Sequence, residues 1–235
     1  MSLLGIVPAR GGSRRIKDKN IVEFFGKPII AYSLEAMRDA GIYDEIHVST
    51  DSEQIRDVVA DLGYDVPFLR TEFHGDKDRL FDVGQWVLKA FLDRGVSFDD
   101  VGIVMACSPL IDGDDLRKGY QHFLEQGRRP LFSVAEYPAP PQQALLLDGD
   151  GSGIRPERMD CFQMRSQDLP HTVFDTGAFY FFAAHDLLNA DMYQFKDSIG
   201  FPIRREKAAD INTPDDLEFA RVLFAGRNAL RKAAE

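Results

Sequence analysis

Five positively charged side chains gather in the loop that follows the first apolar segment. Within residues 8–20, two glycines are combined with five basic residues: Arg10, Gly11, Gly12, Arg14, Arg15, Lys17 and Lys19. Glycine lets backbone N–H groups approach an oxyanion closely, and clustered Lys and Arg neutralise its charge. In a chain with a formal net charge of −10, this clustering predicts a polyphosphate site. A solvated basic loop is the alternative. The segment matches neither G-x-x-x-x-G-K-[ST] nor G-x-G-x-x-G, so a P-loop or dinucleotide site is not predicted.

The overall composition restricts the class of protein. With 235 residues and 44% hydrophobic content, the chain can form one α/β domain around its own core. The acidic surplus argues against nucleic-acid binding, which needs excess Lys and Arg. Cys107 and Cys161 lack metal-ligand spacing, so a structural zinc site is not expected, and a reducing compartment fits. The first residues do not resemble a signal peptide, and no apolar run approaches the roughly 20 residues that span a bilayer. We therefore expect a cytoplasmic protein without a membrane partner.

Alternating strand and helix patterns predict the elements that position the basic loop. Short apolar runs indicate buried strands, and apolar residues at helical spacing indicate helices. The expected strands cover residues 3–7, 45–49, 66–69, 101–106, 131–135 and 178–182. The expected helices cover residues 29–38, 54–62, 82–93, 114–126 and 217–224, with a frayed helix or tail at 228–235. This alternation is typical of a doubly wound, mostly parallel sheet, whose ligands bind at the carboxyl ends of the strands. The basic loop follows the first strand and so lies at such an end.

The alternation stops after Tyr137. Residues 137–170 contain five prolines and a turn-rich run at 148–153. This composition predicts a protruding hairpin or small lobe in place of another strand–helix unit. We therefore expect a single domain over residues 1–235, with an inserted lobe at about residues 137–172.

Short motifs spread along the chain resemble those of one enzyme family. The first is Ile6-Val7-Pro8-Ala9-Arg10-Gly11-Gly12-Ser13-Arg14, with Lys19-Asn20 behind it. The later ones are Ser49-Thr50-Asp51, Ser108-Pro109-Leu110, Arg165-Ser166-Gln167-Asp168-Leu169-Pro170, Gly177-Ala178-Phe179-Tyr180 and Asp210-Ile211-Asn212-Thr213. In type and order they resemble the CMP-sugar synthetases, which are the cytidylyltransferases of sialic, pseudaminic and legionaminic acids and of Kdo. The Arg165 motif and residues 137–145 are most similar to the pseudaminic acid branch. The resemblance implies a Rossmann-like nucleotidyltransferase fold.

The resemblance implies an enzyme that transfers CMP from CTP to the anomeric hydroxyl of an acidic 2-keto sugar and releases pyrophosphate. The implied nucleotide-binding residues are Ala9, Arg10, Gly11, Gly12, Ser13, Arg14, Lys19, Asp78 and Ser108. The implied catalytic residues are Arg10, Lys19 and Asp210. Arg10 and Lys19 would stabilise charge on the triphosphate, the glycines and Ser13 would donate backbone hydrogen bonds, and Ala9 and Ser108 would line the base and ribose pocket.

A metal site is implied near the end of the chain. Mg²⁺ would bridge phosphate oxygens and a carboxylate. The family usually supplies Asp-x-Asp here, whereas this chain has Asp210-Ile211-Asn212. Asn212 can offer a carbonyl oxygen, but with one negative charge fewer. The alternative role for Asp210 is to cap the following helix.

The sugar side is implied by the lobe and the strand that follows it. The implied residues are Gln142, Arg165, Gln167, Asp175, Thr176 and Gly177. Arg165 would bind the substrate carboxylate, because guanidinium pairs with carboxylates in a bidentate manner. An exposed salt bridge is its alternative role. In the family the lobe mediates dimerisation and lends residues to the partner's site, so we expect a homodimer in which Arg165 acts across the interface.

Departures from the family pattern leave alternatives open. Cys107 and Ile111 flank Ser-Pro-Leu in place of the family's Thr and Arg, and residues 76–82 lack its small side chains. The leading prediction is a synthetase for pseudaminic acid or a related nonulosonic acid. One alternative is a CMP-sialic acid or CMP-Kdo synthetase. Another, supported by Asn212, is a catalytically weak nucleotide-binding homologue with a regulatory role. Transfer to a neutral sugar phosphate would suit the fold, but the Arg165 motif argues against it.

Overall fold

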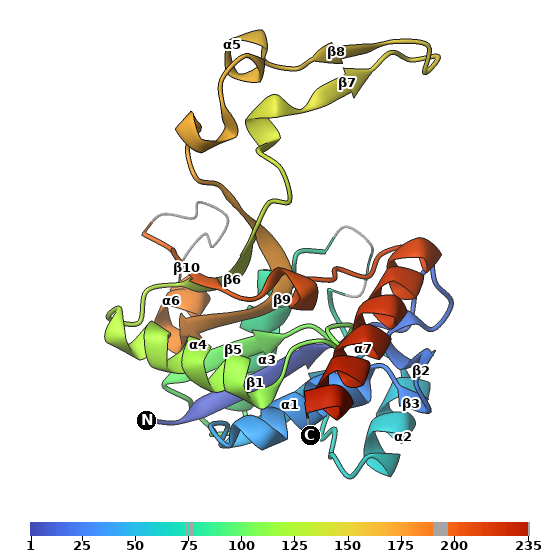
Figure 1. Ribbon diagram of the computed structural model, residues 1–235. Coiled ribbons are helices and arrows are strands. Elements are labelled where there is room, and N and C mark those ends of the chain that lie inside the picture. The colour runs from blue at the N-terminus through green and yellow to red at the C-terminus, as the bar shows by residue number, and fades with distance from the viewer. Residues whose placement is uncertain (74, 76–77, 190–196, 235) are drawn as a thin grey trace.

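A six-stranded sheet forms the centre of the molecule (Figure 1). The computed structural model describes residues 1–73, 75, 78–189 and 197–234. The strands, in chain order, are β1 (Leu3–Pro8), β4 (Glu45–Ser49), β5 (Asp100–Val104), β6 (Leu131–Glu136), β9 (Val173–Ala183) and β10 (Ile199–Pro202). In space the order is β10-β6-β9-β5-β1-β4, and β9 is antiparallel to both neighbours while the other pairs are parallel. The predicted mostly parallel α/β sheet is therefore confirmed.

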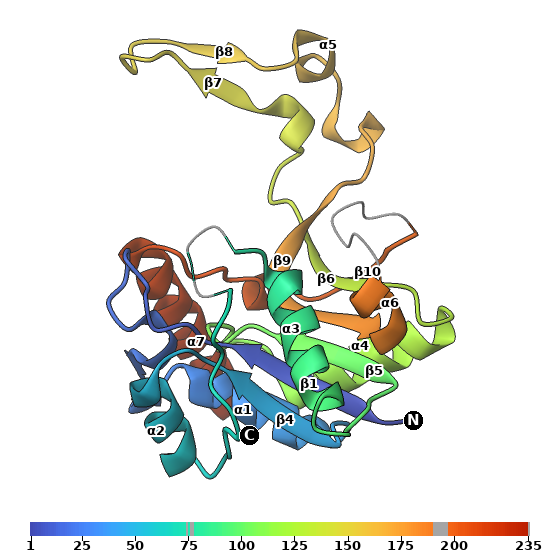
Figure 2. The ribbon, with the colours of Figure 1, turned by 180° about the vertical axis from the view of Figure 1, so that it is seen from behind.

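Helices cover both faces of this sheet, as the opposite views in Figures 1 and 2 show. They are α1 (Ile30–Ala40), α2 (Glu53–Asp61), α3 (Leu80–Leu92), α4 (Gly113–Glu125), α5 (Met159–Phe162), α6 (Ala184–Asn189) and α7 (Pro214–Ala234). Along β1, Leu3 and Val7 pack into the core cluster of α1 and α4, whereas Leu4 and Ile6 pack into the cluster of α3 and α6. Side chains of a strand alternate between its faces, so a continuous apolar run is what a strand covered on both sides requires. No helix within the described ranges is both long and apolar enough to cross a bilayer.

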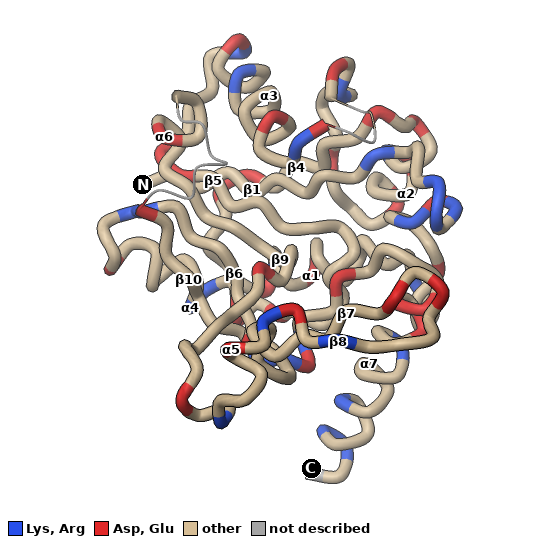
Figure 3. Tube along the Cα trace, turned by 90° about the horizontal axis from the view of Figure 1, so that it is seen from above, with Lys and Arg blue, Asp and Glu red and all other residues tan. Residues whose placement is uncertain are grey.

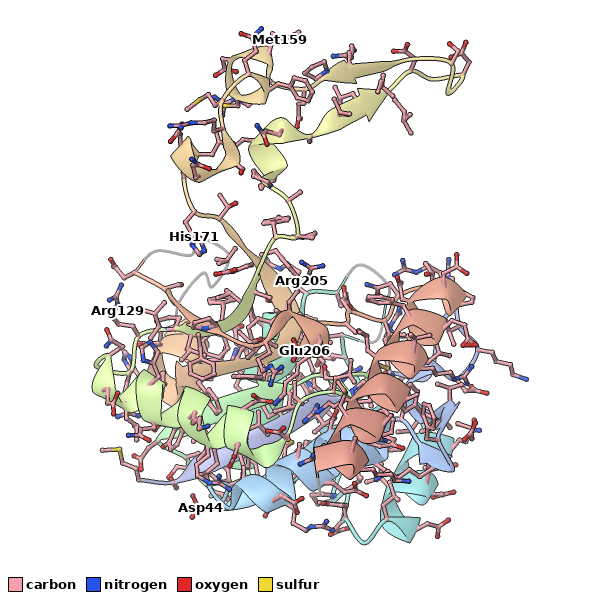
Figure 4. The ribbon with its side chains drawn as sticks, viewed as in Figure 1. Asp44, Arg129, Met159, His171, Arg205 and Glu206 are labelled. Carbon is pink, nitrogen blue, oxygen red and sulfur yellow. The ribbon has the colours of Figure 1, made fainter. Side chains whose placement is uncertain are left out.

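The inserted lobe rises from the carboxyl-terminal edge of the sheet, between β6 and β9 (Figure 1). The β6–β9 ladder ends at the pair Glu136–Val173. The intervening chain holds α5 and an antiparallel hairpin of β7 (Leu145–Leu147) and β8 (Ile154–Pro156). Met159 lies at the far end of the lobe and His171 at its junction with the core (Figure 4). Because β9 runs antiparallel to β6, the chain returns to the same edge from which it left.

Three details of the secondary structure differ from expectation. The predicted strand at residues 66–69 is wrong, because these residues form no ladder with a neighbouring strand. Pro67 has no N–H to donate. The backbone contact follows at Arg70, whose N–H donates to the Thr50 carbonyl just after β4 at 2.7 Å. The edge strand β10 was not predicted, because Gly200 and Pro202 mask its pattern. The expected frayed helix or tail at 228–235 instead continues α7 as far as Ala234.

A buried carboxylate anchors β5 to the segment that follows α4. Asp100 is fully buried and accepts hydrogen bonds from Arg128 Nε at 2.8 Å and Tyr120 Oη at 2.9 Å. Arg128 has a positive φ of 62°, so the turn after α4 adopts a conformation that few residues favour. The ion pair and this turn therefore support each other.

We expect Asp100→Ala to lower the free energy of unfolding by about 3–5 kcal/mol, because the substitution removes one partner of a buried charged pair. Urea denaturation followed by circular dichroism measures this change. The exposed Asp93→Ala on the outer surface serves as the matched control and should stay within about 0.5 kcal/mol of wild type. Equal stabilities of the two variants would contradict the anchoring role.

Candidate active site

A cavity of about 440 Å³ opens at the carboxyl end of β1, next to the basic loop. Figure 3 shows Lys and Arg gathered beside α2 at this side of the molecule. Of the predicted site residues, the cavity wall includes Arg10, Ser13, Arg14, Lys19, Asp78 and Asn212. The wall also contains residues without a predicted role, namely Pro8, Arg15, Asn20, Arg70, Phe73, Gly75, Leu80, Val83 and Met105. A cluster of cations against an apolar wall is suited to an anionic ligand with a flat apolar part.

The start of the basic loop is fixed by backbone contacts. The Ala9 N–H donates to the Ser49 carbonyl at 2.9 Å, and the Gly11 N–H donates to Asp51 Oδ1 at 2.9 Å. A Cβ atom on Gly11 would lie 2.9 Å from the Cβ of Ser52, the N-cap of α2. Glycine is therefore required at position 11 by this close approach, and its N–H bonds a carboxylate instead of facing an anion. Gly12 is exposed and has open space around it.

The loop is joined to the segment before α7. Lys19 Nζ donates to the Ile211 carbonyl at 2.7 Å, and Arg15 Nη2 donates to Asn212 Oδ1 at 3.2 Å. These bonds bring Arg15 and Lys19 of the loop to residues 212 and 211. Asn212 Nδ2 in turn donates to Asp210 Oδ2 at 2.6 Å.

Asn20 and Cys107 support the loop from below. Asn20 is buried, and its Nδ2 donates to the Arg10 carbonyl at 2.9 Å. Cys107 Sγ donates to Asn20 Oδ1 at 3.4 Å, and burial raises the pKa of this thiol to about 12. Cys107 is therefore a neutral hydrogen-bond donor. Cys107, which stands where the family pattern has Thr, thus supports the loop through Asn20. This role was not predicted from the sequence.

Arg70 is a buried cation in the cavity wall. The residue is only 4% exposed, and its Nη1 donates to the carbonyl and hydroxyl oxygens of Ser49 at 2.8 and 2.9 Å. Burial lowers the pKa of Arg70, while the nearby Asp51 and Asp78 oppose this effect. Its Nε has no hydrogen-bond partner among the described residues. Arg70 directly follows the apolar run Val66-Pro67-Phe68-Leu69, and a charge at that place is the sequence signal that could have marked it as a site residue. The run was instead interpreted only as a buried strand, so Arg70 received no role.

Three predicted residues have surroundings that do not fit their expected contacts. Ala9 is fully buried in the core, and Ser108 is buried outside the cavity wall, so neither lines the pocket as expected. Thr176 is also buried, and its Oγ1 bonds the carbonyl and hydroxyl oxygens of Ser133 at 3.0 and 2.7 Å. Thr176 therefore joins β9 to β6 and does not face a sugar. Residues 76 and 77, part of the departure at 76–82, lie outside the described residues.

The remaining sugar-side residues fall into two separate groups. Gln142, Arg165 and Gln167 lie on the lobe, well above the core (Figure 1). Arg165 is highly exposed and pairs with Asp168 of the same lobe, through Nε at 2.8 Å and Nη2 at 3.2 Å. Gln142 Nε2 donates to the Pro170 carbonyl at 3.4 Å. Asp175 and Gly177, by contrast, lie on β9 at the edge of the core.

A bulge in β9 brings Asp175 and Gly177 toward Asp210. Tyr180 pairs with Phe132 and Asp175 with Val134, so β9 carries three residues more than β6 over this interval. Gly177 has a φ of +63°, and a Cβ at this position would lie 3.9 Å from Asp210 Cγ. Asp175 accepts from the Gly177 N–H at 2.9 Å and from the Tyr180 hydroxyl at 3.1 and 3.2 Å. Burial, and then the Asp210 charge, raise the pKa of Asp175.

Among the described residues, no three His, Cys, Asp or Glu side chains form a group that could hold a metal ion. A divalent cation bound here would therefore take most of its ligands from phosphate oxygens and water, as Mg²⁺ commonly does beside nucleotides.

The chain is similar along nearly its whole length to proteins of known activity. A family model described as cytidylyltransferase matches residues 4–232. The chain is 35% identical over 225 residues to pseudaminic acid cytidylyltransferase of Campylobacter jejuni, covering 95% of this chain and 97% of that protein. It is 28% identical to CMP-N,N'-diacetyllegionaminic acid synthase of Legionella pneumophila, covering 92% and 93%. The solved structure of CMP:2-keto-3-deoxy-manno-octonic acid synthetase complexed with CTP has a TM-score of 0.71 at 16% identity, covering 97% of this chain and all of that one.

We expect Asn20→Ala to lower the free energy of unfolding by about 1–3 kcal/mol, since it leaves the Arg10 carbonyl without its buried donor. The loosened loop should also bind inorganic tripolyphosphate more weakly. Urea denaturation and calorimetric titration measure the two effects. Asn228→Ala on α7 is the amide control and should change neither quantity appreciably. Tripolyphosphate binding that is unchanged in Asn20→Ala would show that Asn20 does not position the loop.

Proposed function

The chain belongs to the cytidylyltransferase family, and we propose that it transfers CMP from CTP to the anomeric hydroxyl of an acidic nonulosonic sugar of the pseudaminic acid type. The observation that carries this proposal is the cavity that combines the basic loop with an apolar wall at the carboxyl end of β1. A sequence identity of 35% over nearly the whole length of a pseudaminic acid cytidylyltransferase supports the choice of acceptor. Similarity to the legionaminic acid synthase supports a related acceptor as the second candidate.

The residues of the cavity suit the binding of a nucleoside triphosphate. Arg10, Arg14 and Lys19 supply positive charge around the loop, and the bond from Lys19 to a neutral carbonyl leaves its charge unpaired by that contact. Phe73, Leu80 and Met105 offer apolar surface for the base and ribose. Attack of the anomeric oxygen on the α-phosphate expels pyrophosphate, so catalysis consists mainly of positioning and of stabilising charge on the phosphates.

Asp210 fits the magnesium ion that such a reaction uses. Its carboxylate is exposed beside the basic loop and accepts a hydrogen bond from the neutral amide of Asn212. Mg²⁺, when bound, would neutralise charge that develops on the phosphate oxygens. Lys19 stays on the Ile211 carbonyl and so does not compete with the ion for Asp210.

We also propose that the protein acts in the cytoplasm. Both cysteines, Cys107 and Cys161, are free thiols in the structure, which suits a reducing compartment.

We expect the wild-type protein to release pyrophosphate with CTP, Mg²⁺ and pseudaminic acid, and not with ATP, GTP or UTP. Arg10→Ala should lower kcat/KM by about 10²–10³-fold, because it removes a preorganised positive charge from the phosphate site. A coupled pyrophosphate assay over a panel of pseudaminic, legionaminic and sialic acids and Kdo measures both results. The matched control is Arg56→Ala, whose guanidinium pairs with Asp57 on α2, away from the cavity.

Each other outcome of this assay has a defined meaning. Turnover with a different acidic sugar would replace the acceptor and keep the reaction. CTP binding without turnover on any acceptor would support the regulatory homologue that Asn212 suggests. Unchanged kcat/KM in Arg10→Ala would contradict the assignment of the basic loop to the triphosphate.

We further propose that the protein is a homodimer whose lobes complete each other's acceptor sites. Leu147 and Ile154 on the β7–β8 hairpin are 72% and 64% exposed, and Met159 at the far end is also exposed. Exposed apolar side chains on a protruding element are typical of an interface. Arg165 and Gln167 lie on the same lobe, between α5 and the start of β9.

Mixing two inactive variants tests this shared site. We expect Arg10→Ala and Arg165→Ala each to be inactive alone, and an equimolar mixture that is denatured and refolded together to recover about a quarter of wild-type activity. In a mixed dimer, one site would combine an intact core with an intact lobe from the other subunit. Analytical ultracentrifugation checks the dimer. A mixture without recovered activity, in the presence of mixed dimers, would place each lobe at its own core.

A further inference from the structure

The amide of Asn212 is occupied on both sides. Its Oδ1 accepts from Arg15 Nη2 at 3.2 Å, and its Nδ2 donates to Asp210 Oδ2 at 2.6 Å. A cation shared by Asp210 and Asn212 would need the oxygen where the nitrogen now lies. Reversing the amide would turn its NH₂ group toward the guanidinium of Arg15, so two donors would face each other. Asn212 is therefore a bridge between Arg15 and Asp210 and is poorly placed as a metal ligand.

A second carboxylate reaches the same place from another element. The backbone of Gly177 lies against Asp210, since a Cβ on Gly177 would be 3.9 Å from Asp210 Cγ and 4.0 Å from its Oδ1. The N–H of this same glycine donates to Asp175 Oδ1 at 2.9 Å. Asp175 and Asp210 thus flank one residue in the left-handed region of φ, where side chains are rarely accommodated.

The orientation of Asp175 is fixed from below. The buried Tyr180 places its hydroxyl 3.2 and 3.1 Å from the two carboxylate oxygens. One hydroxyl proton and one N–H leave most lone pairs of the carboxylate unused.

No lysine or arginine in the described part of the chain forms an ion pair with Asp175 or Asp210, and the hydrogen bonds that these carboxylates accept come from neutral donors. Two neighbouring carboxylates without a cationic side chain repel each other unless a cation lies between or beside them. The proposed triphosphate chemistry brings such a cation.

We infer that Asp175, on β9, supplies the second carboxylate of the divalent-cation site and takes the place of the charge that Asn212 lacks. This inference rests on the proposed function, because the cation is the one that accompanies CTP. It moves Asp175 from the predicted sugar contacts to the metal, and it leaves Asn212 as the residue that positions Asp210.

Binding of Mn²⁺ tests the inference without turnover. Free Mn²⁺ is followed by electron paramagnetic resonance while the full-length protein is titrated in the presence of CTP and in the absence of any sugar. We expect Asp175→Asn and Asp210→Asn each to weaken Mn²⁺ binding on the order of tenfold or more, the range seen when a group of a metal site is lost. Asn212→Ala should weaken Mn²⁺ binding less than either carboxylate variant, because it removes only a contact that positions Asp210. Asp61→Asn, an exposed carboxylate at the end of α2, is the matched control.

A replacement ligand provides the second measurement. In Asp175→Cys the thiolate should bind Cd²⁺ and give a thiolate–Cd²⁺ absorption band, because soft ligands prefer soft metals. The wild type, whose two thiols are buried, is the reference. Circular dichroism confirms that each variant is folded.

The outcomes separate this inference from the proposed function. Wild-type Mn²⁺ affinity in Asp175→Asn, with weak binding in Asp210→Asn and Asn212→Ala, would overturn the inference and restore Asn212 as the ligand. Absence of the Cd²⁺ band in folded Asp175→Cys would also count against it. If the wild-type protein bound no CTP in a metal-free titration, the proposed function itself would fail.

Discussion

The hydrogen bond from Lys19 Nζ to the carbonyl oxygen of Ile211 joins the two halves of the site across 192 residues of sequence. Both segments are irregular, so their relative position depends on this bond and on the one between Arg15 and Asn212. Lys19 is held by a neutral carbonyl, and within the described part of the chain no ion pair joins it to Asp210. A phosphate and a cation can then occupy the same small volume, each near a group of opposite charge.

The antiparallel strand in the middle of the sheet explains how the acceptor side reaches this place. β9 begins at the carboxyl-terminal edge, where the parallel strands end, so its first residues lie at the same edge of the sheet as the basic loop. The bulge at Gly177 turns the chain toward Asp210, and the Ser133–Thr176 contact secures the bulge to β6. One strand thus carries the lobe at its start and the core packing of Phe179 and Phe181 at its end.

The sequence predicted best those features that depend on one local pattern of residues. The apolar run of β1 predicted a central strand, the charge cluster after it predicted where basic side chains line the cavity, and the prolines predicted the break after Glu136. Arg70, Asn20 and Cys107 were missed as site residues because their roles depend on contacts between distant segments. Motif position also failed to tell a side chain that faces the cavity from one that faces the core, as Ala9 and Thr176 show. Local patterns do not encode such tertiary contacts.

The paired ends of β6 and β9 form a neck between the sheet and the inserted lobe. This neck allows the sequences of the sheet domain and of the lobe to change independently. Its last cross-strand pair, Glu136–Val173, closes the sheet before the insertion begins. A lobe of another length or sequence could therefore be grafted onto the same pair without shifting the register beneath it. The insertion above the neck can accordingly diverge in length and sequence while the sheet below keeps its pairing, so the two parts of the molecule can evolve at different rates.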